Sequence, residues 1–207
     1  MAQVFPTKGN LIATKKSLEL ATTGFELMDR KRNILIRETM SLMDDAKKIQ
    51  DDINRKYAKA YNALQKANIT LGIIDELSQT IPIDNGIKLD FRSVMGVEIP
   101  IVKIDYVSPK MSYGYSQTNE ALDYAYKKFD EVKVLTVKLA EIENSVYRLA
   151  QGIKKTQKRA NALKNIIIPR FEETIKFISS SLDEKEREEF SRLKVIKLTK
   201  EKNAEPV

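Results

Sequence analysis

Two long stretches of the chain carry apolar or small residues in alternating steps of three and four. A seam this narrow and regular is typical of a coiled coil, in which each helix buries its seam against a partner of equal length. The stricter seam consists of Leu139, Ile142, Val146, Leu149, Ile153, Thr156, Ala160, Leu163 and Ile167. The other stretch, 11–74, supplies a partner through Leu11, Leu18, Ala21, Phe25, Met28, Leu35, Leu42, Ala46, Ile49, Ile53, Ala60, Leu64, Ala67, Leu71 and Ile74.

The first stretch predicts one helix from about Leu11 to Gln79, with Asn10 as its N-cap, since no proline lies between Asn10 and Ile81. The step from Ile53 to Tyr57 is four residues where three is due, after which the pattern resumes at Ala60. A four-residue insertion of this kind is a stutter, which locally relaxes the left-handed supercoil.

The segment that follows this helix predicts a β-hairpin. Ile87–Arg92 and 97–106 are rich in alternating apolar residues, and Met95-Gly96 lies between them as a turn. Pro100 cannot donate to a ladder, so its strand should be an edge strand or carry a bulge. Because an isolated hairpin is marginally stable, it should lean on the coiled coil or on another protein. Its candidate docking residues are Leu89, Phe91, Val97, Ile99 and Ile101.

The second helix should begin near Gln117 and continue to Leu182, with a kink at Pro169. Ser181 and Glu184 could form a capping box that starts a further helix, and the polar residues after Lys197 suggest disorder. The expected organisation is an N-terminal coiled-coil helix (1–80), a hairpin connection (81–116), a C-terminal coiled-coil helix (117–182) and a charged helical extension with a disordered tail (183–207).

These elements predict an all-α fold, a long antiparallel two-helix coiled coil with a small β-hairpin at the turn. Matching the helix ends gives partners whose numbers add up to roughly 195, so that Thr39 faces Thr156. The same register brings basic residues of both helices together. We call the following set the basic belt: Arg30, Lys31, Arg32, Lys154, Lys155, Lys158 and Arg159. Its long side chains could cover apolar surface or contact an acidic partner.

Composition excludes most catalytic chemistry. The chain has 207 residues with no Cys and no His, so disulfides, most metal sites and most nucleophile–base pairs are not expected. There is no glycine-rich phosphate loop, and the adjacent carboxylate pairs diverge around a helix. We expect no enzyme activity, no cofactor and no metal. No apolar run is long enough to span a membrane, which suggests a cytosol-like location.

The formal net charge is +7, with charged residues making up 31% of the chain. This is compatible with a solvated helical surface, with a rod that meets an acidic partner, or with nucleic-acid binding. The last is not expected, because acids interleave with the basic residues over most of the chain and no nucleic-acid-binding motif is present.

Three segments carry a family resemblance: the lead Pro6–Leu11, the run 155–175 (KTQKRANALKNIIIPRFEETI) and the run 182–194 (LDEKEREEFSRLK). Together with the mid-chain hairpin, they resemble the D subunit, which forms the central stalk of V-type and archaeal-type (V/A) rotary ATPases. The resemblance covers nearly the whole chain, and 155–175 is its most specific part.

The resemblance implies a non-catalytic rotor shaft that transmits torque in an ion-transporting complex of ATP synthesis or hydrolysis. It implies that the end with both termini enters a ring of three A and three B subunits. The hairpin end would meet the small F subunit of the stalk and the funnel-like subunit on the membrane rotor ring, at the cytoplasmic face of the membrane. The alternative is a coiled-coil spacer or tether that holds two partners apart.

Overall fold

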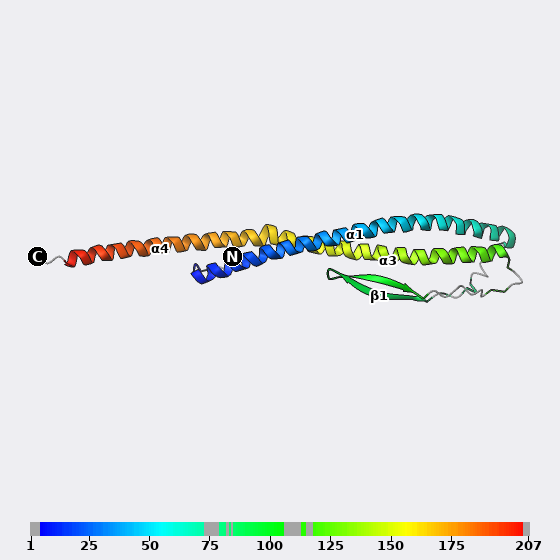
Figure 1. Cartoon of the computed structure of the whole chain (residues 1–207), viewed down its shortest axis with the longest axis horizontal. Coiled ribbons are helices and arrows are strands. Elements are labelled where there is room, and N and C mark those ends of the chain that lie inside the picture. The colour runs from blue at the N-terminus through cyan, green and yellow to red at the C-terminus, as the bar shows by residue number, and fades with distance from the viewer. Residues whose placement is uncertain are drawn as a thin grey trace. The chain divides into compact units, whose positions relative to one another are not determined.

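The computed structural model describes residues 5–72, 79–81, 83, 85–105, 113–114 and 118–204. The chain is mostly helical, with a small hairpin between two long helical segments, as the sequence predicts (Figure 1). It divides into two units, one of residues 1–31 with 155–207 and the other of residues 32–154. The elements in chain order are α1 (Lys8–Leu71), β1 (Ile87–Val94), β2 (Val97–Ile104), α3 (Glu120–Ala162), the π-helix η2 (Leu163–Ile167) and α4 (Ile168–Ala204).

Helix α1 begins at Lys8, so the predicted N-cap at Asn10 is wrong. The cap is Thr7, whose Oγ1 accepts the Asn10 backbone N–H at 3.2 Å. The Asn10 side chain reaches back and donates from Nδ2 to the Phe5 carbonyl at 2.8 Å. A threonine hydroxyl placed three residues before the donor satisfies one of the free N–H groups of the first turn, which an asparagine inside the turn cannot do.

Helix α1 ends at Leu71, so the predicted end at Gln79 is wrong as well. Gly72 has φ +77°, and its N–H donates to the Asn68 carbonyl at 2.9 Å. Glycine adopts this left-handed conformation without a Cβ penalty, and it closes the helix in an αL cap. Residues 73–78, which the predicted helix included, lie outside the described residues.

The hairpin forms as predicted, with Met95 and Gly96 at its two-residue turn. Both have positive φ, 50° and 73°, as a type I′ turn requires. The register is continuous from Val94 opposite Val97 to Ile87 opposite Ile104, without a bulge. Residues that flank a two-residue turn exchange hydrogen bonds, and every second residue after them points its backbone groups away from the partner strand. Pro100 is one of these residues, so its missing N–H removes no bond of the ladder.

The hairpin packs on the helices of its own unit. Leu35 of α1 and Leu149 of α3 are fully buried together with Ile99 of β2, which is 2% exposed. Val94 and Val97, at the hairpin tip, pack against this cluster. Of the two supports that the sequence leaves open, the coiled coil is the one observed.

In the unit of residues 32–154, α1 and α3 pair antiparallel. The Asn119 side chain donates to Thr70 Oγ1 at 2.7 Å, and Tyr61 packs edge-on against Phe129 with ring centroids 5.4 Å apart. The predicted register would instead place Tyr61 near Val134, between one and two helical turns away. The register of this unit therefore differs from the predicted one, because α1 ends at Leu71. The expected match of Thr39 with Thr156 joins residues of different units and stays a prediction.

In the other unit, the start of α1 pairs antiparallel with the end of α3, η2 and α4. Lys8 forms an ion pair with Glu186 at 2.9 Å, and Lys164 Nζ lies 5.7 Å from the centre of the Phe25 ring. Buried seam residues in this unit are Ala21, Thr156, Ala160 and Ile178.

The interruption that the sequence predicts at Pro169 takes the form of a widened turn. In η2 the Ile168 N–H donates to the Leu163 carbonyl, five residues back. This extra residue in the turn suits a proline, which has no N–H for the ordinary bond to Asn165. Helix α4 then continues to Ala204, so the predictions of a new helix at Ser181 and of disorder after Lys197 are wrong.

We expect Leu35→Ala to lower the free energy of unfolding by roughly 2–5 kcal/mol, because it leaves a cavity against Ile99 and Leu149. The matched control is Leu27→Ala on the same helix, since Leu27 is 58% exposed and should change stability by about 0.5 kcal/mol or less. Urea unfolding followed by circular dichroism measures both. Equal effects would contradict the described core.

Candidate partner-docking surfaces

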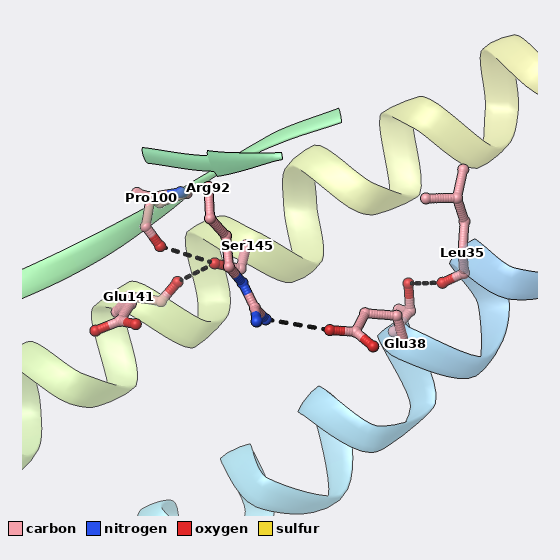
Figure 2. Close-up of polar contacts among 7 residues, drawn as sticks. Leu35, Glu38, Arg92, Pro100, Glu141 and Ser145 are labelled. Carbon is pink, nitrogen blue, oxygen red and sulfur yellow. Dashed lines mark hydrogen bonds and ion pairs between the residues drawn. The ribbon is translucent and has the colours of Figure 1, made fainter. Parts of the chain in front are cut away.

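Side chains of α3 contact the outer edge of β2, and Figure 2 shows one of these contacts, between Ser145 and the Pro100 carbonyl. Glu141 Oε2 accepts the Val102 N–H at 3.1 Å, and Arg148 Nη1 lies 3.4 Å from the Glu98 carbonyl. Between them, Ser145 Oγ lies 3.4 Å from the Pro100 carbonyl, but it also lies 2.8 Å from the Glu141 carbonyl. A hydroxyl has one proton, so the shorter bond within α3 is the stronger one. The edge of β2 is therefore occupied within the chain.

Ion pairs fix the charged side chains of β1. Arg92 Nη2 lies 3.1 Å from Glu38 Oε1 on α1, which ties the hairpin to a second helix (Figure 2). Asp90 Oδ2 accepts from Lys103 Nζ at 2.8 Å, and its Oδ1 accepts the Phe91 N–H at the same distance. The hydrogen bond from Lys103, followed by that from the Phe91 N–H, lowers the pKa of Asp90.

Gly152 sets how closely the hairpin tip approaches α3. A Cβ added to Gly152 would lie 2.7 Å from Val97 Cγ2, closer than real side chains approach. A glycine within a helix lowers its stability relative to alanine, so this position is held for the contact rather than for the helix. Gly24 of α1 differs, because its added Cβ would lie at an ordinary 3.9 Å from Leu163 Cδ1.

The structure divides the five hairpin candidates into two groups. Ile99 lies in the core, while Val97 and Ile101 are half-buried. Leu89 and Phe91, on β1, are 65% and 54% exposed, so they are the members available to a partner. Sequence reasoning missed Ile87, which is 49% exposed and lies on the same face as Leu89 and Phe91.

Four residues of the basic belt lie on α3, and all four are exposed: Lys154, Lys155, Lys158 and Arg159. Among the residues that the structure describes, none of these four forms an ion pair with a carboxylate. On α1, Arg30 is exposed, whereas Lys31 and Arg32 are half-buried. That both sets form one belt stays a prediction.

The described residues contain no group of three or more His, Cys, Asp or Glu side chains placed to hold a metal ion. Within the same part of the chain, no helix is long and apolar enough to cross a membrane.

Sequence reasoning also missed the residues that seat the hairpin: Glu38, Glu141, Ser145, Arg148 and Gly152. Gly152 carried a usable signal, since an isolated glycine in a helical heptad pattern often marks a close approach of another segment. The polar residues carried none, because nothing in a heptad pattern distinguishes a side chain that bonds a strand edge from one in water.

We expect Gly152→Ala to displace the hairpin tip and to lower the free energy of unfolding by roughly 1–3 kcal/mol through overpacking against Val97. The control, Gly24→Ala, should raise it by up to about 1 kcal/mol, because alanine favours the helix and the site has room. Urea titration gives both values. Adding Val97→Ala should restore stability to Gly152→Ala, and failure to do so would contradict the proposed clash.

We expect the hairpin to loosen in acid. Because the pKa of Asp90 is lowered in the folded chain, its contribution is present above the ordinary aspartate value of 3.8 and is lost as the pH falls through the lowered pKa. The protection factor of the Phe91 amide, which is the ratio of its intrinsic to its observed exchange rate, should therefore fall as the pH drops below about 3.8. In Asp90→Asn this fall should vanish, and the same pH profile in both chains would contradict the role given to Asp90.

Comparison with known proteins finds a matching family and several relatives of this chain. The family model for the D subunit of ATP synthase matches residues 10–198. The D subunit of the V-type ATP synthase of Thermotoga neapolitana is 47% identical over 196 residues, covering 94% of this chain and 97% of the relative. The D subunit of the A-type ATP synthase of Pyrococcus horikoshii is 38% identical and covers 94% of each chain. That of Methanosphaera stadtmanae is also 38% identical, over 93% of this chain and 92% of its own.

A family match over most of the chain, relatives of similar length and a mostly helical fold with a mid-chain hairpin agree with one another. The chain belongs to the family of D subunits of the V-type and A-type ATP synthases.

Proposed function

We propose that this chain is the non-catalytic central rotor shaft of a V/A-type ATPase. In this role it transmits torque between the ATP-handling A/B hexamer and the membrane ring that translocates ions. Family membership makes it a subunit of the rotary ATPase. The shaft role goes further, and the helical architecture of this chain supports it.

The observation that carries the proposal is the length and continuity of the helices. Helix α1 has 64 residues, and the chain is helical without a break from Glu120 to Ala204. Within each unit the helices pair antiparallel through fully buried positions such as Leu35, Leu149 and Ile178. A rod under torque must not unwind, and interlocked seam residues resist the sliding of one helix past the other that unwinding requires.

We further propose the partners and the location. The A and B subunits would surround the end that bears both termini, with the basic belt facing acidic loops of that ring. The small F subunit of the stalk and the funnel-like subunit would meet the end that bears the hairpin. The complex would hold this chain at the cytoplasmic face of the membrane. The acidic contact is supported by four exposed basic side chains that have no carboxylate partner among the described residues: Lys154, Lys155, Lys158 and Arg159.

A rotation assay tests the shaft role, and the sequence helps because it contains no cysteine. Asp51→Cys places one thiol on the exposed side of α1, where a bead can be attached. With the A/B hexamer fixed to a surface, ATP should drive steady rotation of the bead in one direction. A spacer or tether predicts ATP hydrolysis while the bead stays still, and that result would overturn the proposal.

The belt proposal has its own test. Changing Lys154, Lys155, Lys158 and Arg159 to Gln should weaken assembly with the A/B hexamer by about fourfold or more at low salt, if each exposed contact contributes roughly 0.2–1 kcal/mol. The difference from the unmodified chain should shrink as salt is raised.

The matched control changes the same number of exposed lysines that form no ion pair among the described residues, at Lys47, Lys59, Lys66 and Lys127. Sedimentation of the assembled complex at several salt concentrations measures the affinity. Equal weakening by both variants would show a nonspecific effect of net charge, and unchanged assembly and coupling would end the belt proposal.

A further inference from the structure

The two edges of the hairpin differ in what their backbone groups contact. Because Val94 and Val97 flank the two-residue turn, alternate residues of β1 point their backbone groups away from β2. The bond from the Asp105 N–H to the Gly86 carbonyl, at 3.0 Å, fits this alternation at the far end of the ladder. The outward-facing residues of β1 are therefore Ile87, Leu89, Phe91 and Ser93.

This outer edge of β1 is open, unlike that of β2. Among the described residues, none bonds the backbone N–H of Leu89 or of Ser93. The Phe91 N–H is held only by Asp90, its own neighbour in the chain. On β2 the equivalent outward groups of Glu98, Pro100 and Val102 meet side chains of α3.

Three of the four side chains along the open edge are apolar, and the charges of β1 lie on the opposite face. Ile87, Leu89 and Phe91 are 49%, 65% and 54% exposed and share one face. Each charge on the other face has a partner within the chain: Lys88 with Asp105, Asp90 with Lys103, and Arg92 with Glu38. Exposed edge strands are usually protected by charged side chains, and this one presents alternating apolar residues instead.

We propose that the outer edge of β1 is a docking site for an extended strand from another subunit of the complex. The strand would continue the β1–β2 ladder and bond the backbone groups of Leu89 and Ser93. It would place alternate apolar side chains over Ile87, Leu89 and Phe91. At Phe91, its carbonyl would replace the Asp90 carboxylate as acceptor.

Several observations favour a strand over other occupants. Open backbone donors and acceptors at a two-residue repeat match the spacing of a strand and not that of a helix. Face-on packing of another surface would use the apolar side chains but leave the edge groups without partners. The contacts of Glu38, Glu141, Ser145, Arg148 and Gly152 with the hairpin fix the edge in place, so that little ordering is needed on binding.

This inference rests on the proposed function only in taking the strand from a partner within the assembly. Amide hydrogen exchange of β1 tests it, comparing the full chain alone with the complex purified from its native cells. The Leu89 and Ser93 amides should exchange at least tenfold more slowly in the complex. The Asp90 and Arg92 amides already lie in the ladder and should change little.

Two variants separate strand addition from face packing. Leu89→Pro removes one outward N–H and no ladder bond, the arrangement that Pro100 already shows on β2. Leu89→Thr keeps the N–H and the strand preference but trims the apolar surface. Leu89→Pro should abolish the protection of Ser93 in the complex, while Leu89→Thr should retain it. Protection of Arg92 in the isolated variant confirms that the hairpin still folds.

Three results would overturn the proposal. The first is an unchanged exchange of Leu89 and Ser93 on assembly. The second is protection that appears in the isolated chain and grows with its concentration, which would identify a second copy of this chain. The third is equal loss in both variants, which would identify face packing. None of these results depends on rotation of the shaft. If the bead in the rotation assay stays still while the amides of Leu89 and Ser93 are protected in the complex, only the shaft role is refuted.

Discussion

The burial of a narrow seam between two helices is the constraint on which this structure depends. Small residues such as Ala60, Ala67 and Ala125 are almost fully buried, so the helix axes of the unit 32–154 lie close together. A seam residue without a partner on the other helix would be exposed to water, so paired helices should end at the same level. In this unit specific groups fix the two helix ends. Gly72 closes α1 where the Asn119 side chain, at the start of α3, bonds Thr70. The register of that unit follows from these two ends.

The hairpin is held in place by contacts that the seam between the helices does not provide by itself. A two-stranded sheet cannot satisfy its own edges or bury both faces. This one buries Ile99 with Leu35 and Leu149 and lays the edge of β2 along α3. The two edges therefore differ: that of β2 is occupied by side chains of α3, whereas the described residues leave the outer backbone N–H groups of Leu89 and Ser93 on β1 without a partner. The proposed rotor shaft would have to present different surfaces to different partners, and this asymmetry would serve that role better than two regular helices alone.

The sequence predicts regular elements well and their ends poorly, for a physical reason. Heptad spacing identified the seam, including Leu35, Leu149 and Ala160, because burial repeats along a helix. Met95-Gly96 marked the turn because few residues adopt positive φ. The ends of α1 were predicted wrongly because a single capping hydrogen bond decides where a helix begins or ends. Thr7 and Asn10 are both residue types that cap helices, and a glycine such as Gly72 can lie either inside a helix or at its end. The widened turn before Pro169 and the seat of the hairpin depend on contacts between distant residues, which no local pattern encodes.

The central claim is that this chain turns inside the ring that handles ATP. The most direct measurement locks it in place: Lys158→Cys provides the only thiol in the chain, and a cleavable thiol-to-thiol crosslinker joins it to a cysteine introduced into the surrounding ring. ATP hydrolysis should stop when the crosslink forms and return when it is cleaved. Hydrolysis that continues at its full rate in the crosslinked complex would contradict the account.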